Sequence, residues 1–322
     1  MKLPLAYIAS SLLSSTKDLA FNSWCAEVGI VCPNAEVRTT PASVAGRGVF
    51  TTSDVSEGDV VLSIPYYCAL TQENGRQYFP DLGSKLNSCR KKTQSPIRRL
   101  WNQIIGKNDN PLVDDDFWQA ELTAYAIEAI ETNHPWAEWI SQWFREDPYQ
   151  QLVNTATWKF DSEVLNGTLD DFSSMAPDIS KYKVNAAVGI RLAELYKYAK
   201  NYQNKVPFSE STYALLTSRA IGISDGITAC LPMHDMINHN FNPNVVMQFN
   251  EGFFEFVALR DIPKDSELFL SYMDITDDEG QWDEDKATWM LVQWGIPTSP
   301  CDVEVISTQH DDEVTVRENI VQ

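Results

Sequence analysis

The pattern of apolar residues changes twice along the chain, from strand-like to helix-like and back, and this alternation limits the fold more than any other feature. Residues 44–70 hold short β-branched runs separated by Gly-containing turns, which is the pattern of short strands. From about Ser95 to Tyr202, apolar residues recur at helical spacing instead, as in "FWQAELTAYAIEAI" and "VNAAVGIRLAELYKY". Strand-like runs return from about Asn244. The sequence therefore predicts a mixed α+β fold, mainly β, with a large α-helical insertion.

The second β part has a clear internal order. "NVVMQFNEGFFEFVALRDI" predicts a hairpin that turns at Asn250-Glu251-Gly252, and "SELFLSY" predicts another short strand. The acidic "MDITDDEGQWDED" is typical of an exposed loop, and "KATWMLVQWGIP" predicts a helix that ends at Gly295. We expect five segments: a lead-in or targeting segment 1–20, a first β part 21–96, the helical insertion 97–208, a second β part 209–297 and an acidic tail 298–322.

Composition excludes several partners. The 322 residues are 43% hydrophobic, which is enough for a sizeable core. The formal charge of -20 disfavours nucleic acid, because phosphate contacts need clustered Lys and Arg. Six scattered cysteines without a C-x-x-C pair indicate neither a zinc cluster nor a disulfide framework, and favour a reducing compartment. No window approaches the roughly eighteen apolar residues of a membrane-spanning helix. We expect no nucleic-acid partner and no membrane.

The first residues, "MKLPLAYIASSLLSS", allow two interpretations. Lys2 followed by an apolar run ending in small residues resembles a weak signal peptide. Alternatively, Leu5, Ile8 and Leu12 lie at the spacing of an amphipathic helix that leads into the fold. The apolar run is broken, so we favour the helix.

The stretch "LPMHDMINHN", residues 231–240, gathers two histidines with Asp235 and Asn238. Zinc-binding histidines on a helix are four residues apart and share a face, whereas His234 and His239 are five apart. No third ligand with metal spacing lies nearby, so we expect no metal. A metallohydrolase built on His234, Asp235 and His239 is a third hypothesis, which predicts a bound metal.

Two other enzyme classes fit poorly. A Ser/His/Asp hydrolase would need a nucleophile elbow, and the chain has no G-x-S-x-G. Gly46-Arg47-Gly48 could suggest a phosphate-binding loop, but the P-loop consensus is absent and no helix follows. Taken alone, such a G-x-G is more often a tight turn before a strand.

The order of the motifs is more informative than any one of them. "AGRGVF", "EGDVVLSIP", the helical insert, "TSRAIG", "LPMHDMINHNFNPNVV", "ALRDIPKDSELFLSY" and "VQWGI" follow one another. This series resembles the SET-domain methyltransferases, and within them the plant Rubisco large-subunit lysine methyltransferase branch, which has a helical insert and no zinc-binding post-SET element. "DMINHNFNPN" is the most specific piece. The resemblance implies a SET fold whose two parts are residues 21–96 and 209–297, the second with the cofactor and catalytic motifs.

The resemblance also implies a cofactor, S-adenosyl-L-methionine, and residues that hold it. The backbone of the glycine turn would lie against the cofactor, since glycine has no Cβ to obstruct a close approach. Asn238 and His239 would hold the polar edges of the cofactor, with the His239 backbone reading the adenine. The implied cofactor-binding residues are Ala45, Gly46, Arg47, Gly48, Asn238 and His239. Arg219 and Asp235, whose opposite charges could pair, would orient this segment and line the cofactor or substrate pocket, and they are the implied substrate-binding residues together with Tyr272.

Tyr272 is the catalytic residue that the resemblance implies, and it would also contact the substrate. Methyl transfer needs a neutral amine, whereas a free lysine has a pKa of about 10.4. The sulfonium charge would favour loss of the proton, and the Tyr272 hydroxyl would orient the lone pair of the amine. Most of the acceleration would come from aligning the two bound reactants.

The chain departs from the family pattern in ways that leave its substrate open. An acidic insertion follows Tyr272, and Trp294 stands where many members carry a second tyrosine in the substrate channel. Members usually continue into a helical substrate-binding domain, so their substrates do not carry over. We expect a monomer that methylates a lysine of a non-histone protein or peptide. A protein-histidine methyltransferase and an inactive SET-fold binding module are the alternatives.

Overall fold

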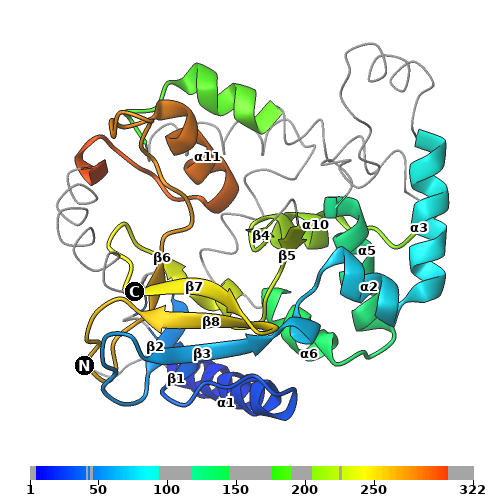
Figure 1. The fold of residues 1–322 in the computed structure, drawn as a ribbon, viewed down its shortest axis with the longest axis horizontal. Helices are drawn as coiled ribbons and strands as arrows, with labels where there is room; N and C mark the ends of the chain where they lie inside the picture. Colours follow the sequence, from blue (N-terminus) through cyan, green and yellow to red (C-terminus); the bar gives the residue numbers. More distant parts are fainter. Residues whose placement is uncertain are drawn as a thin grey trace. The chain divides into compact units, whose positions relative to one another are not determined.

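The computed structural model describes residues 5–40, 43, 46–93, 118–144, 176–189, 205–224 and 227–303 (Figure 1). The chain forms two compact units, which we describe separately. Unit 1 comprises Met1–Tyr66, Glu146–Ile190 and Met233–Gln322, and unit 2 comprises Tyr67–Arg145 and Arg191–Pro232. The five-segment division inferred from the sequence stays a prediction, because the units cut the chain at other points.

Unit 1 contains three small sheets among its described residues. Strands β1 (Ala35–Thr39) and β2 (Arg47–Thr51) pair antiparallel. Strands β3 (Val60–Pro65), β8 (Phe253–Ala258) and β7 (Val245–Asn250) form an antiparallel sheet in the order β3-β8-β7. The two-residue strands β6 (Asn238–His239) and β9 (Phe269–Leu270) pair in parallel. Segments from both ends of the sequence therefore share one unit, as the β texture predicts.

The predicted hairpin is confirmed as β7 and β8. Its turn places Glu251 at φ 47° and Gly252 at φ 86°. Positive φ at both turn positions matches the right-handed twist of the flanking strands, and glycine adopts it without strain. Along β8, Phe254 and Phe256 are buried whereas Phe253 is exposed, which is the alternation expected of a strand with one face on the core.

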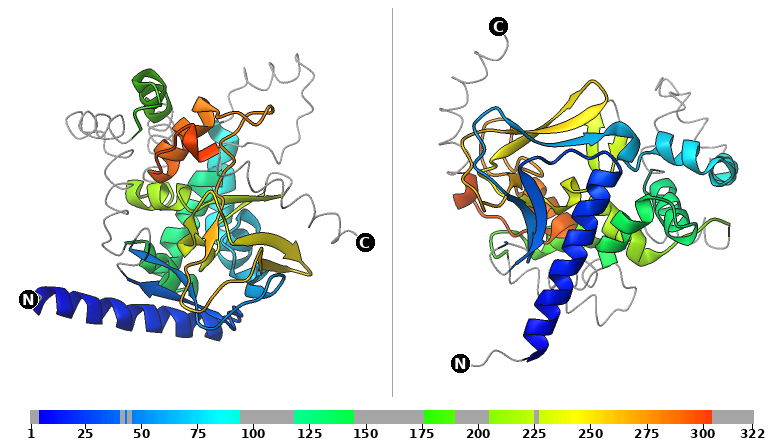
Figure 2. Two further views of the ribbon diagram at one scale, coloured as in Figure 1. Left: turned by 90° about the vertical axis from the view of Figure 1, so that its left-hand side faces the viewer. Right: turned by 90° about the horizontal axis from the view of Figure 1, so that it is seen from below.

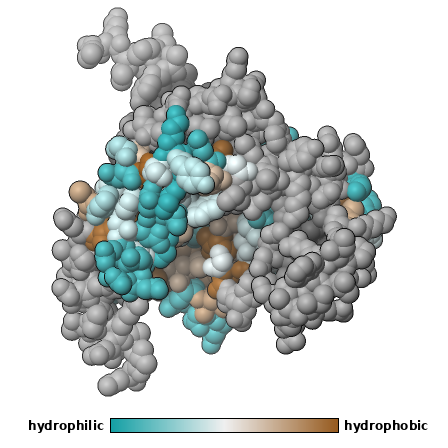
Figure 3. All heavy atoms as spheres, turned by 90° about the horizontal axis from the view of Figure 1, so that it is seen from above, coloured by the Kyte–Doolittle hydropathy of each residue, from teal (hydrophilic) through white to brown (hydrophobic). Residues whose placement is uncertain are grey.

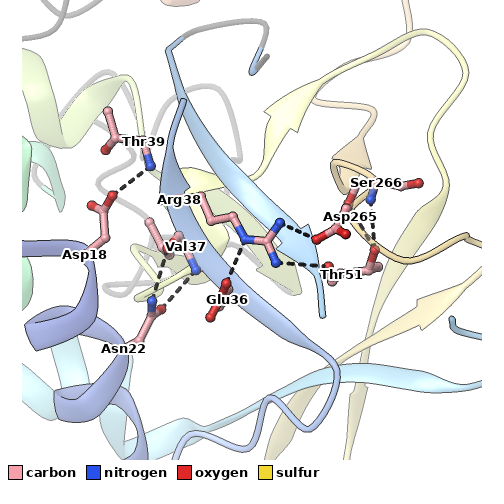
Figure 4. A network of polar contacts seen from close by, with 9 residues as sticks. All are labelled: Asp18, Asn22, Glu36, Val37, Arg38, Thr39, Thr51, Asp265 and Ser266. Atoms are coloured by element: carbon pink, nitrogen blue, oxygen red, sulfur yellow. Dashed lines mark hydrogen bonds and ion pairs between the residues drawn. The ribbon is translucent and has the colours of Figure 1, made fainter. Parts of the chain in front are cut away.

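Helix α1 (Leu5–Glu27) runs beside β1, and Figure 2 shows it as one long helix. A helix is therefore present where one was expected, and it extends to Glu27, whereas the choice between a lead-in and a targeting segment stays a prediction. Asn22 Nδ2 donates to Val37 O at 3.0 Å and Val37 N donates to Asn22 Oδ1 at 2.9 Å (Figure 4). Thr39 N donates to Asp18 at 2.7 Å. These side chains satisfy backbone groups that an edge strand would otherwise expose.

The predicted strand over "SELFLSY" is shorter than expected, and the reason lies in its partners. Its first half pairs with β2: Thr51 N donates to Ser266 O at 2.9 Å and Leu268 N donates to Val49 O at 2.8 Å. Its second half, β9, leaves β2 and pairs with β6. One short segment thus connects the glycine turn before β2 with the Asn238-His239 segment.

Helix α11 (Glu284–Trp294) confirms the predicted closing helix. Asp283 caps its N-terminus by accepting from the backbone N–H groups of Asp285 and Lys286. Gly295 ends it in the left-handed conformation at φ 70°, as the sequence predicts. The acidic loop before it is held by Asx-type turns, in which Asp274 accepts from Thr276 N and Asp277 accepts from Glu279 N.

Unit 2 is mainly helical among its described residues. Its elements are η1 (Tyr66–Cys68, at the boundary), α2 (Gln72–Tyr78), α3 (Pro80–Thr93), α5 (Trp118–Glu131), α6 (Trp136–Ser141), η2 (Gln142–Phe144), α10 (Glu210–Thr217), β4 (Ile221–Ser224) and β5 (Ile227–Ala229). The helix predicted from "FWQAELTAYAIEAI" is confirmed as α5. The helix predicted from "VNAAVGIRLAELYKY" covers positions on both sides of the division between the units; residues 184–189 are helical and the rest lie outside the described residues. Within the described helices, none is both long and apolar enough to cross a membrane.

Candidate functional site

The histidine-rich stretch folds as an irregular turn rather than a helix. Met233 adopts φ 65°, a 3-10 helix η3 spans His234–Met236, and β6 follows directly. The His234 ring lies 5.7 Å from the Phe256 ring, whereas the His239 ring lies 4.5 Å from that of Phe241. Within the described ranges, no three His, Cys, Asp or Glu side chains gather as metal ligands. The two histidines have different neighbours and different surroundings.

Parallel pairing of β6 with β9 brings Tyr272 to this stretch. His239 is opposite Leu270 in the register, and Tyr272 follows two residues later. Tyr272 N donates to His239 Nδ1 at 3.1 Å, and the Tyr272 hydroxyl donates to Ile237 O at 2.6 Å. The Tyr272 ring also lies 5.4 Å from the His239 ring and 5.5 Å from the Trp294 ring. Tyr272 is thus held at its backbone, its hydroxyl and its ring.

Asn238 connects the same stretch to the glycine turn. Its Nδ2 donates to Arg47 O at 2.9 Å, although 191 positions separate the two residues. Gly46 has φ 81°, and no heavy atom lies within 4 Å of the position that a Cβ would occupy there. Arg47 is buried and begins β2. Gly46, Arg47, Gly48, Asn238, His239 and Tyr272 therefore belong to one connected cluster, and Ala45 lies outside the described residues.

The structure leaves the predicted role of Arg219 and Asp235 open. Arg219 belongs to unit 2, where its Nη1 donates to Leu215 O at 3.0 Å and its guanidinium lies 5.8 Å from the Trp143 ring. Asp235 belongs to unit 1, in η3. The pairing of Arg219 with Asp235 stays a prediction.

Two residues of the cluster were missed by the sequence interpretation. Glu267 is 8% exposed and accepts from Ser43 Oγ at 2.8 Å and from Asn238 Nδ2 at 2.6 Å. A signal for Glu267 was present, since a carboxylate opens the otherwise apolar "ELFL" run. Ser43 gave none, because a serine in a turn is unremarkable.

Burial keeps both histidines neutral. Desolvation lowers the pKa of His234 to about 4, and it lowers the pKa of His239 to about 4 against the opposing effects of the Leu270 backbone and Asp302. A neutral imidazole has one unprotonated nitrogen, which can accept a hydrogen bond. In His239 this nitrogen is Nδ1, which accepts from Tyr272 N. Protonation at Nδ1 would break that hydrogen bond.

Acidification is expected to destabilise unit 1 through these histidines. Their folded pKa of about 4 lies below the ordinary value of 6.5, so the unfolded chain binds more protons and stability falls as the pH drops from about 6.5 towards 4. The loss at His234 should be on the order of 3 kcal/mol. Melting temperatures across this range check it: His234→Gln should flatten the pH dependence, and an unchanged slope would contradict the assignment.

The segment that follows Tyr272 in the sequence is rich in Asp and Glu. Residues 277–281 are exposed, and Lys183 pairs with Glu284 at 3.1 Å and with Asp285 at 2.6 Å. Figure 3 views the molecule from above, and the described surface there carries hydrophilic residues beside a patch of hydrophobic ones. The exposure of residues 277–281 agrees with the exposed loop predicted from the sequence.

Comparison with known proteins identifies the family. A family model described as SET domain matches residues 46–273, a range that contains the whole described cluster except Ser43. The chain belongs to the SET-domain family, and the family and fold class inferred from the motif series are confirmed.

Similar proteins include curated and solved examples. The N-lysine methyltransferase SETD6 of Bos taurus is 20% identical over 316 residues, covering 94% of this chain and 62% of that protein. The chain therefore spans about three fifths of that relative. Among solved structures, Rubisco LSMT bound to AdoMet has a TM-score of 0.47 at 12% identity, with 88% of this chain and 56% of that chain covered. The SET domain of LSMT bound to lysine and AdoHcy has a TM-score of 0.46 at 12% identity, covering 88% and 58%.

Proposed function

We propose that this protein is an S-adenosylmethionine-dependent methyltransferase that modifies a lysine side chain of a non-histone protein. One observation carries the proposal: parallel pairing of β6 and β9, inside the SET-domain match, holds Tyr272 against Asn238 and His239. A tyrosine hydroxyl is thereby held beside residues suited to binding a methyl donor. The similarity to an N-lysine methyltransferase supports lysine over histidine as the target.

The described residues fit such a cofactor. Asn238 Oδ1 has no hydrogen-bond donor among the described residues, so it is available to an N–H or O–H group of a ligand. The backbone at Gly46 is open where a side chain would otherwise stand, which permits close approach of a ligand. When bound, S-adenosylmethionine supplies an activated methyl group on a positively charged sulfur.

The contribution of Tyr272 is positional. Its hydroxyl donates to Ile237 O, which fixes the position of the oxygen that would contact a substrate amine or polarised C–H groups. Because the ring and the backbone are also held, these contacts form without further ordering of the side chain. Arg219 and Asp235 are proposed to bind the substrate, and the partner is a protein or peptide.

Label transfer tests the proposal. The purified chain is incubated with S-adenosylmethionine labelled on the methyl group and with candidate proteins, and labelled peptides are sequenced by mass spectrometry. We expect label on lysine; label on histidine would establish the alternative enzyme. If calorimetry detects no cofactor binding at saturating concentration, the chain is a SET-fold binding module instead.

Trp294 is expected to limit the number of methyl groups transferred. Its ring contacts that of Tyr272, so it occupies space beside the reacting centre. Trp294→Phe removes bulk there, and we expect the fraction of di- and trimethylated product to rise severalfold in mass spectra. Trp289→Phe is the matched control, because positions five apart on α11 do not share a face. An identical product distribution in the two variants would argue against this role.

A further inference from the structure

A buried carboxylate lies at the centre of the cluster, and the proposed function gives it no role. Glu267 lies in the segment just before β9. It is paired with Phe50 of β2 in an isolated antiparallel bridge, shortly before this segment separates from β2. Its Oε1 accepts from Asn238 Nδ2 and from Ser43 Oγ, at 2.6 and 2.8 Å. Hydrogen bonds to a charged acceptor are among the strongest in proteins.

The amide of Asn238 has only one orientation that satisfies its neighbours. Three oxygens surround Nδ2: Glu267 Oε1 at 2.6 Å, Arg47 O at 2.9 Å and Ser43 Oγ at 3.1 Å. An amide nitrogen has two hydrogens, so these acceptors use both of them. The flipped amide would set its oxygen against two oxygens that carry no hydrogen, Glu267 Oε1 and Arg47 O. Asn238 Oδ1 therefore faces away from Glu267.

The second glycine of the turn makes room for this carboxylate. A Cβ at Gly48 would lie 2.2 Å from Glu267 Oε1 and 3.1 Å from Ser43 Oγ. The first contact is far shorter than real Cβ contacts, so any larger residue would displace Glu267. The need to accommodate Glu267 therefore explains why position 48 holds a glycine. At Gly46, by contrast, the position of a Cβ is open space.

We propose that Glu267 is a positioning residue that sets cofactor affinity through Asn238. By accepting from Nδ2 it holds the amide with Oδ1 towards the cofactor. Its charge also polarises the amide and makes Oδ1 a stronger acceptor, since linked hydrogen bonds strengthen one another in a poorly hydrated site. This inference rests on the proposed function and adds to it the residue that orients a binding group.

A double-mutant cycle tests the proposal by calorimetry with S-adenosylmethionine. We expect Glu267→Gln to raise Kd about tenfold, because the charge that orients and polarises the amide is lost. In the Asn238→Ala background the same change should alter Kd less than about twofold, since coupled residues are not additive. In the enzyme assay, KM for the cofactor should rise while kcat at saturating cofactor stays within about twofold.

Glu255→Gln is the matched control. Glu255 lies on β8 and accepts from Asn250 Nδ2 at 3.2 Å, so the same chemistry is removed from an exposed carboxylate–amide contact. Equal Kd for wild type and Glu267→Gln, or an equal loss in the Asn238→Ala background, overturns the proposal. Absence of binding by the wild type overturns the proposed function instead.

A second variant covers the case in which Glu267→Gln does not fold. Asn238→Asp sets a carboxylate oxygen against Glu267 Oε1 and should weaken cofactor binding at least tenfold. Adding Glu267→Gln supplies an amide that can donate to Asp at 238 and should recover part of the affinity. No recovery in the folded double variant counts against positioning through residue 238.

Discussion

Tyr272→Phe is expected to lower kcat about 100- to 1,000-fold, the range seen when one group that acts at the transition state is removed. The substitution removes only the hydroxyl oxygen, which donates to Ile237 O and which we propose contacts the reactants. Cofactor affinity should change little, because Asn238 and the glycine turn hold the cofactor in the proposed site. Single-turnover rates at saturating cofactor and substrate measure the effect.

Tyr78→Phe is the control for this substitution. Tyr78 belongs to unit 2, and its hydroxyl donates to the Tyr67 carbonyl at 3.2 Å, so the same oxygen is deleted from the same kind of contact outside the proposed site. Its kcat should stay within about twofold of wild type. If Tyr272→Phe were folded and equally active, the catalytic role of Tyr272 would be refuted and the inactive binding module would regain support.

The sequence predicted the local elements best where one residue type permits few backbone conformations. Glu251-Gly252 requires a tight turn with positive φ, and Gly295 before Pro297 ends a helix. Both predictions depend on backbone stereochemistry within a few residues, and both are confirmed. Local chemistry decides such features before any tertiary contact forms.

The strand over "SELFLSY" shows where local pattern is insufficient. Its residues have one continuous strand-like pattern of apolar side chains. The backbone nevertheless pairs with β2 up to Leu268 and with β6 from Phe269. Pairing of this kind is set by segments far away in the chain, which a local pattern does not contain. The same change of partner places Glu267 beside Gly48 and Asn238, so the missed residue and the shortened strand have one cause.

The motif order predicted which residues would meet, but not how. Asn238 and Gly46-Arg47-Gly48 were assigned to one cofactor site, and the structure joins them through the hydrogen bond from Asn238 to Arg47 O. His239 was expected to present backbone groups, whereas its side chain accepts from Tyr272 N. The side-chain hydrogen bonds depend on rotamers and burial, and no spacing along the chain encodes them.

Arg76→Met should strongly destabilise unit 2, with a loss of about 2–3 kcal/mol, below the range for a fully buried pair because the Arg76 side chain is 37% exposed and partly screened by solvent. Glu121 is fully buried, and Arg76 donates to both of its carboxylate oxygens at 2.8 and 2.9 Å. Gln72 and Tyr125 complete its hydrogen bonds at 2.6 and 3.0 Å, but neither carries a positive charge. The substitution therefore leaves a carboxylate buried between α2 and α5 without a counter-ion.

Two comparisons separate the buried charge from the loss of packing. Arg76→Met with Glu121→Leu removes both charges, so most of the stability should return, because a buried ion pair replaced by apolar residues is often neutral. Arg38→Met is the exposed counterpart: its partners Glu36 and Asp265 are 37% and 59% exposed, and the expected loss is below about 1 kcal/mol. Urea unfolding followed by tryptophan fluorescence ranks the variants. A double variant as unstable as Arg76→Met would show that the arginine stabilises α2 and α5 through packing rather than by compensating Glu121.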